Sequence, residues 1–133
     1  MIDEEYKYTR ITAKIIRCAR SVQDTLGNGF DAVTYQKALA IEMELLNLHF
    51  LEDHEMPVFY QEQPIGVKKI TFLVEGVVSV ELRAIAQLED FHFSQVENYL
   101  VACNVEVGVL LNFGNTELGF RRFTNRKFKA PTF

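Results

Sequence analysis

The chain has 133 residues, of which 48% are hydrophobic and 24% are charged, and its formal net charge is -4 at pH 7. This length fits a single domain, and the composition excludes an intrinsically disordered chain because it supplies enough apolar side chains to bury a core. The negative charge argues against a protein that coats nucleic acid by bulk electrostatics, although a local basic patch is still compatible with it.

The chain shows no sign of export or of membrane insertion. Residues 1–5 are acidic, without the basic leader and apolar run of a signal peptide, and no stretch approaches the roughly 20 apolar residues that cross a bilayer. We therefore expect a soluble, cytoplasmic protein with no membrane partner. Cys18 and Cys103 fit no metal or redox spacing and are expected to pack as small hydrophobic side chains.

The first third of the chain predicts a helical hairpin. Apolar residues recur every three or four positions between residues 9 and 26, and Gly27-Asn28-Gly29 then ends this helix because glycine adopts positive φ without steric cost. Asp31 is placed to cap a second helix from residue 32 to about residue 48. Four residues are expected on the buried side of the second helix: Tyr35, Leu39, Leu45 and Leu46.

Strands are predicted next. Residues 57–60 form a short extended piece, and residues 61–66 supply turn chemistry with Pro64 and Gly66. Residues 67–74 and 77–85 are rich in β-branched side chains and flank Glu75-Gly76, which is typical of a β-hairpin.

The last third predicts a helix followed by two strands. Helical spacing returns over residues 90–104, the nearly continuous apolar run 105–113 is typical of a central strand covered on both faces, and residues 117–123 predict a last strand. Residues 121–129 contain the basic cluster of a C-terminal tail, about residues 121–133. The order of elements predicts one α/β domain over residues 1–133, a small mixed sheet flanked by helices.

Three segments carry a more specific signal. The first runs from Gly29 through Ala32 and Tyr35 to Glu42, on the second predicted helix. The second is the predicted hairpin, Thr71-Phe72-Leu73-Val74-Glu75-Gly76 followed by Val80-Glu81-Leu82-Arg83-Ala84. The third contains His92, Gln95 and Asn98-Tyr99-Leu100, followed by Val107-Gly108-Val109-Leu110-Leu111-Asn112-Phe113-Gly114.

In their order and spacing these segments resemble the GxxExxY family, a compact branch of the PD-(D/E)XK nuclease-like superfamily, over roughly residues 11–123. The resemblance implies a restriction-endonuclease-like core with an N-terminal helical hairpin. Ala32 stands where the family has the Glu of its naming motif, and Thr71 stands where the nuclease motif has its metal-binding Asp. Glu81 is retained at the acidic position of the E-x-K element, whose Lys is replaced by Arg83.

These replacements bear on metal-dependent cleavage. Such a site needs Mg²⁺ to neutralise developing charge and to orient water, and Mg²⁺ is usually held by one or two carboxylates. Glu81 alone supplies too few ligands to hold Mg²⁺ well, so we expect no metal and no cofactor. Mg²⁺ or Mn²⁺ would enter only if Glu42, which the resemblance places where related nucleases often present another acidic residue, joined Glu81. A solvated helix face is the alternative for Glu42.

The register of the hairpin decides which side chains meet. Residues 81 and 83 point to one face of a strand because side chains alternate with period two. Thr71 joins that face opposite Glu81 only if the loop has an odd residue count, such as Glu75-Gly76-Val77, or contains a bulge. Glu81 and Arg83 then either neutralise each other or contact a ligand. A two-residue Glu75-Gly76 turn would put Thr71 and Glu81 on opposite faces.

Other candidates are weaker. Gln95 and Tyr99 lie one helical turn apart and share a face, which the resemblance places beside the active site, and His92 adds a possible acid or base. The alternative is that Gln95 bonds to the backbone and that Tyr99 fills the core. Tyr35 is a further candidate because it is the Tyr of the naming motif. Arg121 and Arg122, next to Phe123, could contact a phosphate backbone, or they could belong to a flexible solvated terminus.

Three functions stay open at this point. The first, which we favour, is a catalytically degenerate nuclease-fold protein that acts as a binding or assembly module and could contact nucleic acid. The second is an active Mg²⁺-dependent nuclease whose rearranged site uses Glu81 and Glu42. The third is a self-associating structural protein, because 11 Phe and 5 Tyr are many for one small domain to bury, and a homodimer would cover the excess.

Overall fold

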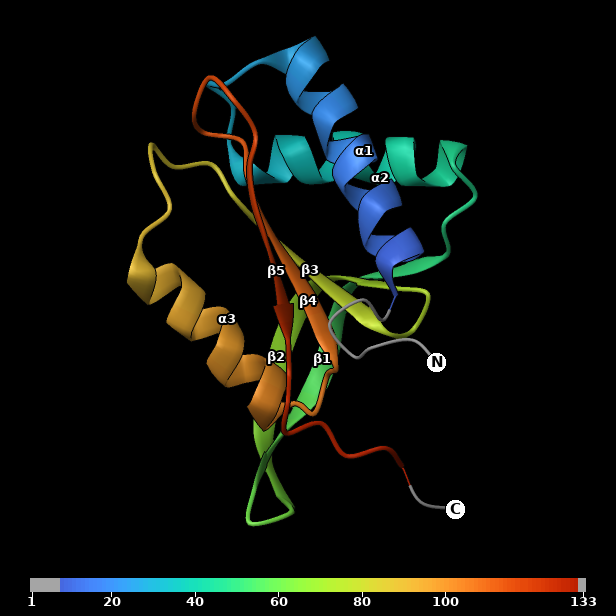
Figure 1. Cartoon of the computed structure of the whole chain (residues 1–133), viewed down its shortest axis with the longest axis vertical. Helices are drawn as coiled ribbons and strands as arrows, with labels where there is room; N and C mark the ends of the chain where they lie inside the picture. Colours follow the sequence, from blue (N-terminus) through green and yellow to red (C-terminus); the bar gives the residue numbers. More distant parts are fainter. Residues whose placement is uncertain (1–7, 132–133) are drawn as a thin grey trace.

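The computed structural model describes residues 8–131, in which three helices pack on a five-stranded sheet (Figure 1). The helices are α1 (Thr9–Leu26), α2 (Ala32–Leu45) and α3 (Asp90–Ala102). The strands are β1 (Phe50–Tyr60), β2 (Gln63–Val74), β3 (Val78–Arg83), β4 (Val107–Asn112) and β5 (Gly119–Thr124). The acidic segment at residues 1–5 lies outside the described residues.

The sheet has the order β1-β2-β3-β4-β5. All neighbouring strands pair antiparallel except β3 and β4, which are parallel and are connected through α3. Parallel neighbours need a crossover connection, which α3 supplies. The predicted α/β fold with a small mixed sheet is confirmed. No helix among residues 8–131 is long and apolar enough to cross a membrane.

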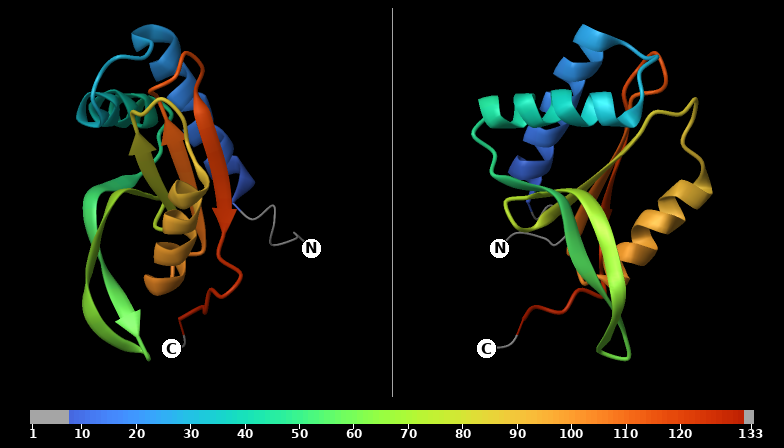
Figure 2. Two further views of the ribbon diagram at one scale, coloured as in Figure 1. Left: turned by 90° about the vertical axis from the view of Figure 1, so that its left-hand side faces the viewer. Right: turned by 180° about the vertical axis from the view of Figure 1, so that it is seen from behind.

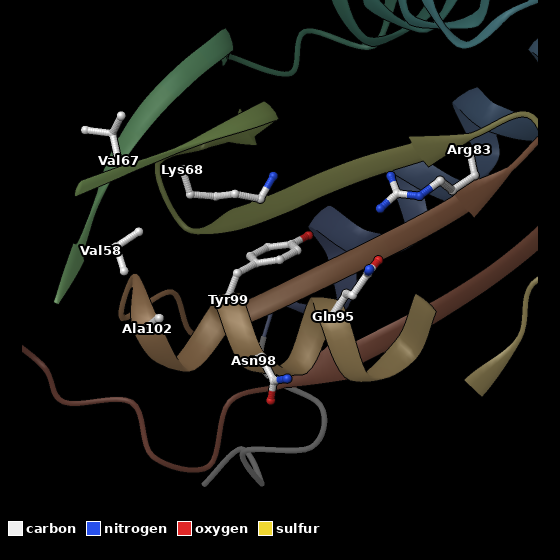
Figure 3. Close-up of a pocket in the computed structure, with 8 residues that line it drawn as sticks. All are labelled: Val58, Val67, Lys68, Arg83, Gln95, Asn98, Tyr99 and Ala102. Atoms are coloured by element: carbon white, nitrogen blue, oxygen red, sulfur yellow. The ribbon is translucent and has the colours of Figure 1, made fainter. Parts of the chain in front are cut away.

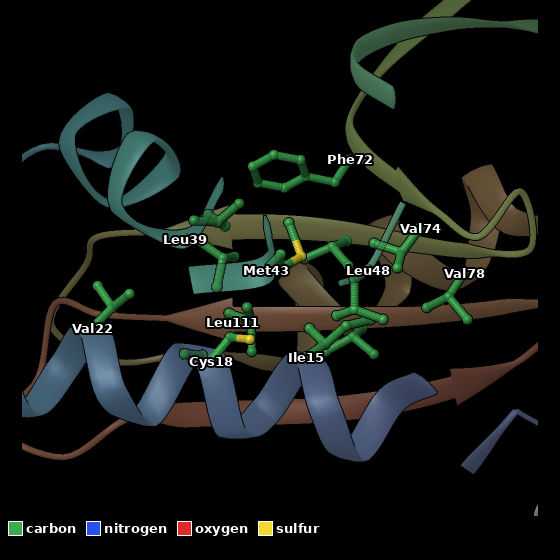
Figure 4. Packing of buried hydrophobic residues seen from close by; sticks show 14 of the residues in the cluster. Ile15, Cys18, Val22, Leu39, Met43, Leu48, Phe72, Val74, Val78 and Leu111 are labelled. Carbon is green, nitrogen blue, oxygen red and sulfur yellow. The ribbon is translucent and has the colours of Figure 1, made fainter. Parts of the chain in front are cut away.

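Each face of the sheet has its own apolar core. On one face, Ile15 of α1 and Leu39 of α2 pack against side chains of β2, β3 and β4, among them Phe72, Val80 and Leu111 (Figure 4). On the other face, a smaller cluster joins α3 to the sheet, and its members are Ile70, Val96, Leu100, Cys103, Val105, Leu110 and Phe123. We call these the α1/α2 face and the α3 face.

The helical hairpin forms largely as its sequence predicts. The backbone N–H of Gly27, where φ is 68°, donates to the carbonyl of Gln23 and ends α1. The Asp31 carboxylate accepts from the Thr34 backbone N–H at 2.9 Å, so Asp31 caps α2.

The C-terminal end of α2 differs from the prediction. The helix ends at Leu45, because Asn47 adopts a positive φ of 59° and the N–H groups of the next residues bond back to the last turn. Tyr35 and Leu39 are buried as predicted, and Leu46 is half-buried. Leu45 is 69% exposed, contrary to the prediction, because Met43 takes the next buried position after Leu39.

The hairpin of β1 and β2 is much longer than predicted. The two strands are connected by Gln61 and Glu62, both at positive φ. The predicted turn over residues 61–66 is thus confirmed at its first two residues and wrong for residues 63–66, which belong to β2. The hairpin extends away from α1 and α2 beyond the rest of the sheet (Figure 2). No residue of β1 is fully buried, so the strand lacks the apolar alternation by which its first half could have been recognised.

The hairpin of β2 and β3 determines the geometry of the site. Val74 pairs with Val78, so the loop has the three residues Glu75-Gly76-Val77, the odd count that puts Thr71 on the same face as Glu81. All six residues of β4 are buried, which confirms the predicted central strand.

Candidate functional site

Glu81 is a buried carboxylate in the middle of β3. It is 5% exposed, and its neighbours in sequence, Val80 and Leu82, belong to the α1/α2 core. Because side chains alternate along a strand, Glu81 points to the α3 face.

Two residues of β2 and one of β3 surround the Glu81 carboxylate. The Thr71 backbone N–H donates to Glu81 Oε1 at 3.3 Å, and the Thr71 hydroxyl donates to Oε2 at 3.2 Å. Lys68 Nζ lies 3.8 Å from Oε1, and Arg83 Nη1 lies 3.9 Å from Oε2. Burial raises the pKa of the Glu81 carboxyl above its ordinary value, and Lys68, Thr71 and Arg83 offset part of that effect.

A pocket of about 560 Å³ opens beside this cluster between β1, β2, β3 and α3 (Figure 3). Its polar lining consists of Lys68, Arg83, Gln95, Asn98 and Tyr99, and its apolar lining consists of Val58, Val67 and Ala102. A volume of this size falls in the range of small-ligand sites.

The Tyr99 side chain connects the pocket to the buried carboxylate. Lys68 Nζ lies 4.9 Å from the centre of the Tyr99 ring, a cation–π contact. The Ser79 hydroxyl lies close enough to Tyr99 to lower the pKa of Tyr99. Both hydroxyls are nevertheless buried without a well-formed hydrogen bond among residues 8–131. Burial, and then the charge of Glu81, raise the pKa of Tyr99.

The structure thus brings Thr71, Glu81, Arg83, Gln95 and Tyr99 to one place. The sequence reasoning missed Lys68, which contacts both Glu81 and Tyr99. No local pattern marks this lysine, since only the pairing and twist of the long hairpin turn it toward α3.

Glu42 is not brought to this cluster. It is a half-buried residue of α2, on the α1/α2 side of the sheet, whereas the Glu81 carboxylate is on the α3 side. Its charge acts instead on the Cys18 thiol in the α1/α2 core. Burial raises the pKa of this thiol to about 11, and the charge of Glu42 adds to the rise. A shared Glu42–Glu81 metal site therefore has no geometric support.

His92 and Tyr35 have structural contacts outside the pocket. His92 Nδ1 accepts from the Glu89 backbone N–H at 2.9 Å in a capping box at the start of α3. The Tyr35 ring stacks on Phe113 with centroids 4.6 Å apart, and its hydroxyl donates to the Gly27 carbonyl. Tyr35 thereby closes the connection between α1 and α2.

The two arginines of β5 point to different sides. The Arg121 guanidinium lies 4.3 Å from the centre of the Phe93 ring on the α3 face, and Arg122 Nη1 donates to the Thr124 hydroxyl. The described part of the tail that follows, up to residue 131, is held to the fold, since Lys129 and Asn104 exchange two hydrogen bonds of 2.9 and 2.8 Å.

The residues around Glu81 do not fit a magnesium ion. Mg²⁺ requires an octahedral set of oxygen ligands. Glu81 is the carboxylate of the cluster, the Thr71 hydroxyl is engaged with it, and two cationic side chains lie within 4 Å. Among residues 8–131, no group of three or more His, Cys, Asp or Glu side chains is arranged to hold a metal ion.

Comparison with protein families gives the class of the chain. The model of the PD-(D/E)XK nuclease superfamily matches residues 9–123, and the chain belongs to this superfamily. Its finer assignment to the GxxExxY branch stays a prediction. Neither the curated proteins nor the solved structures gave a significant match.

Proposed function

We propose that this protein is a catalytically degenerate member of the nuclease superfamily that binds nucleic acid at the Lys68–Arg83 pocket without cleaving it. The observation that carries the proposal is the environment of Glu81. Two donors of Thr71 and two cationic side chains surround the carboxylate that a nuclease would offer to a metal. The same two cations are at the wall of an open pocket.

The lining of the pocket suits a nucleotide unit of a longer chain. Lys68 and Arg83 supply positive charge at one end, and the planar guanidinium of Arg83 can bind a phosphate through two hydrogen bonds. Val58, Val67 and Ala102 form an apolar end that can accept a base or a sugar.

The first test concerns metal and cleavage. We expect no stoichiometric binding of Mg²⁺ or Mn²⁺ by isothermal titration calorimetry, and no cleavage of single-stranded or duplex DNA and RNA. The double variant Thr71→Asp/Arg83→Lys places a second carboxylate beside Glu81 and removes the guanidinium, so it should gain divalent-ion binding. A metal site in the wild-type protein that disappears in Glu81→Ala would contradict the proposal and favour an active nuclease.

The second test concerns the pocket itself. A dinucleotide with one phosphodiester is titrated into ¹⁵N-labelled protein, and we expect shifts of the amide signals around Lys68, Arg83 and Tyr99. Lys68→Gln and Arg83→Gln should each weaken binding by about tenfold, the loss of one charge-assisted hydrogen bond. Lys69→Gln is the matched control, because Lys69 is exposed and does not line the pocket. Equal effects of all three variants would refute binding of the dinucleotide in the pocket.

One observation favours self-association as a second function. The outer side of α2 carries Val33, Ile41 and Leu45, which are 57%, 61% and 69% exposed. Although Lys37 and Glu44 are also exposed on this side, exposed apolar residues on the outer side of a helix commonly mark a contact with a partner. Light scattering should then show a dimer that Ile41→Lys dissociates, and a monomer at millimolar concentration would exclude this function.

A further inference from the structure

The outward side of α1 carries a row of positive charges. Arg10, Lys14, Arg17 and Arg20 follow at intervals of four, three and three residues, so they share one side of the helix, and all four are exposed. Asp24 is the acidic residue of α1. With a rise of 1.5 Å per residue, the row is about 15 Å long.

The fold does not pair these cations with carboxylates. Within residues 8–131, no carboxylate lies within 4 Å of the charged groups of Arg10, Lys14, Arg17 or Arg20. Glu42 of α2 faces α1, where its charge raises the pKa of Cys18 and the charges of Arg17 and Lys14 lower it. On a chain with a net charge of -4, such a row confines attraction for a polyanion to one surface.

An exposed aromatic ring lies at the end of this row. Phe120 of β5 pairs with Leu111, a member of the α1/α2 core, so its side chain is on the α1 side of the sheet. Phe120 is 42% exposed, and the Arg20 guanidinium lies 5.3 Å from the centre of its ring.

We propose that the α1–β5 surface, defined as Arg10, Lys14, Arg17, Arg20 and Phe120, binds single-stranded nucleic acid. The phosphates follow the row of cations, and one base stacks on Phe120. Proteins that bind single strands combine a positive track with aromatic rings on which bases stack. A duplex keeps its bases paired and cannot place one on Phe120, which selects the single strand.

This surface is separate from the pocket. α1 covers one face of the sheet, and the pocket opens against α3 on the other face. The inference therefore does not depend on binding in the pocket, and a strand longer than a dinucleotide could contact both surfaces.

The test compares two variants of equal net charge. A labelled 20-nucleotide single strand is titrated by fluorescence anisotropy at several salt concentrations. Lys14→Gln/Arg17→Gln/Arg20→Gln neutralises the row. Lys37→Gln/Lys69→Gln/Lys127→Gln removes three exposed charges elsewhere and is the control. The row variant should lower the slope of log affinity against log salt by about 2, at roughly 0.7 for each phosphate that the protein no longer neutralises, and the control should leave the slope unchanged.

The aromatic ring is tested by Phe120→Ala and Phe120→Tyr. Loss of one stacked base should weaken binding of the single strand by about 5-fold to 150-fold, and tyrosine should restore most of the affinity. Binding of a duplex of equal length should be weaker than that of the single strand and insensitive to Phe120→Ala.

Several outcomes would overturn the inference. These are equal salt slopes for the row variant and its control, a duplex that binds as tightly as the single strand, and binding of phosphatidylserine vesicles without binding of the oligonucleotide. The pocket is judged separately by the dinucleotide, which is too short to reach both faces. If the row variant keeps the salt slope of the wild type while the dinucleotide binds in the pocket, only binding at the α1–β5 surface is refuted. If the row variant lowers the slope while the dinucleotide does not bind, only binding in the pocket is refuted.

Discussion

The two faces of the sheet differ in what they bury: one buries a large apolar core, and the other buries a charged group beside an open pocket. The α1/α2 face is covered by two helices, and its core is a continuous apolar cluster that includes Ile15, Leu39, Phe72 and Leu111. The α3 face is covered by one helix, and beside its smaller core lie the buried carboxylate of Glu81, the half-buried Lys68 and an open pocket.

This difference shows which face maintains the fold and which face retains a polar site. A buried carboxylate loses the solvation of water, and cations at 3.8 and 3.9 Å offset only part of that loss. An apolar residue in place of Glu81 would serve packing better. The polar cluster therefore has a cost in stability, which the α1/α2 face does not have.

The largest expected effect compares one truncated leucine on each face. Leu39→Ala should destabilise the protein by about 4 kcal/mol, because this fully buried side chain lies in a closed core that cannot collapse. Leu100→Ala should cost about 2–3 kcal/mol, since Leu100 also borders a surface hollow and its site can relax. Urea unfolding measures both, and equal losses would remove the distinction between the faces.

A smaller effect, of opposite sign, is expected at the buried carboxylate. Glu81→Gln should stabilise the protein at pH 7 by about 1–2 kcal/mol, because the amide keeps a hydrogen-bonding partner for Thr71 without a buried charge. Lower stability of the variant at neutral pH would show that the two cations more than compensate burial.

The pH dependence gives the sign of this effect independently. The folded-state pKa of Glu81 is raised, so folding favours the protonated carboxyl. Its contribution to stability is fully present below the ordinary pKa of 4.5 and is lost as the pH rises through the raised folded-state pKa. The advantage of Glu81→Gln should therefore grow with pH across this window and then level off in unfolding measured from pH 4 to 8. Dinucleotide affinity of the wild type should fall over the same window, since ionised Glu81 competes for Lys68 and Arg83.

His92→Ala should destabilise the protein by about 1 kcal/mol, because the Glu89 N–H loses its acceptor at the start of α3. Dinucleotide binding should be unchanged, since His92 does not line the pocket. Parallel NMR titration and urea unfolding measure both effects. A loss of affinity without a loss of stability would show that His92 takes part in ligand binding.

The smallest change in stability is expected from Tyr99→Phe. The Tyr99 hydroxyl is buried without a hydrogen bond of good geometry, so its removal should alter the free energy of unfolding by less than about 1 kcal/mol. A ligand that uses this hydroxyl would bind more weakly to the variant. Thermal unfolding and dinucleotide titration together distinguish a binding role from a packing role.

Local patterns predicted much of the fold. The spacing of α1, the Asp31 cap, the apolar run of β4 and the order of the later elements could all be read without a structure. The first half of β1 could not, because an exposed edge strand carries charged residues without apolar alternation. Leu45 was misplaced because α2 carries apolar residues on more than one side, so its buried side depends on which helix and strands it meets.

The candidate site divides in a similar way. Glu81, Arg83, Gln95 and Tyr99 were predicted from the resemblance together with strand and helix periodicity, and Thr71 was predicted conditionally on the length of one loop. Lys68 and the row of cations on α1 were missed. Lys68 meets Glu81 only through pairing and twist of the long hairpin, and the four α1 cations are dispersed in sequence and form a row only on the helix surface.

The sequence by itself determined the α/β class and the superfamily resemblance, because these depend on residue identity and local spacing. It also led to the prediction that Ala32 and Thr71 stand in place of acidic residues of the family. Only the tertiary structure decided which charges meet. It placed Lys68 and Arg83 beside Glu81 and put Glu42 on the opposite side of the sheet, because side-chain partners across a sheet depend on strand register and helix packing.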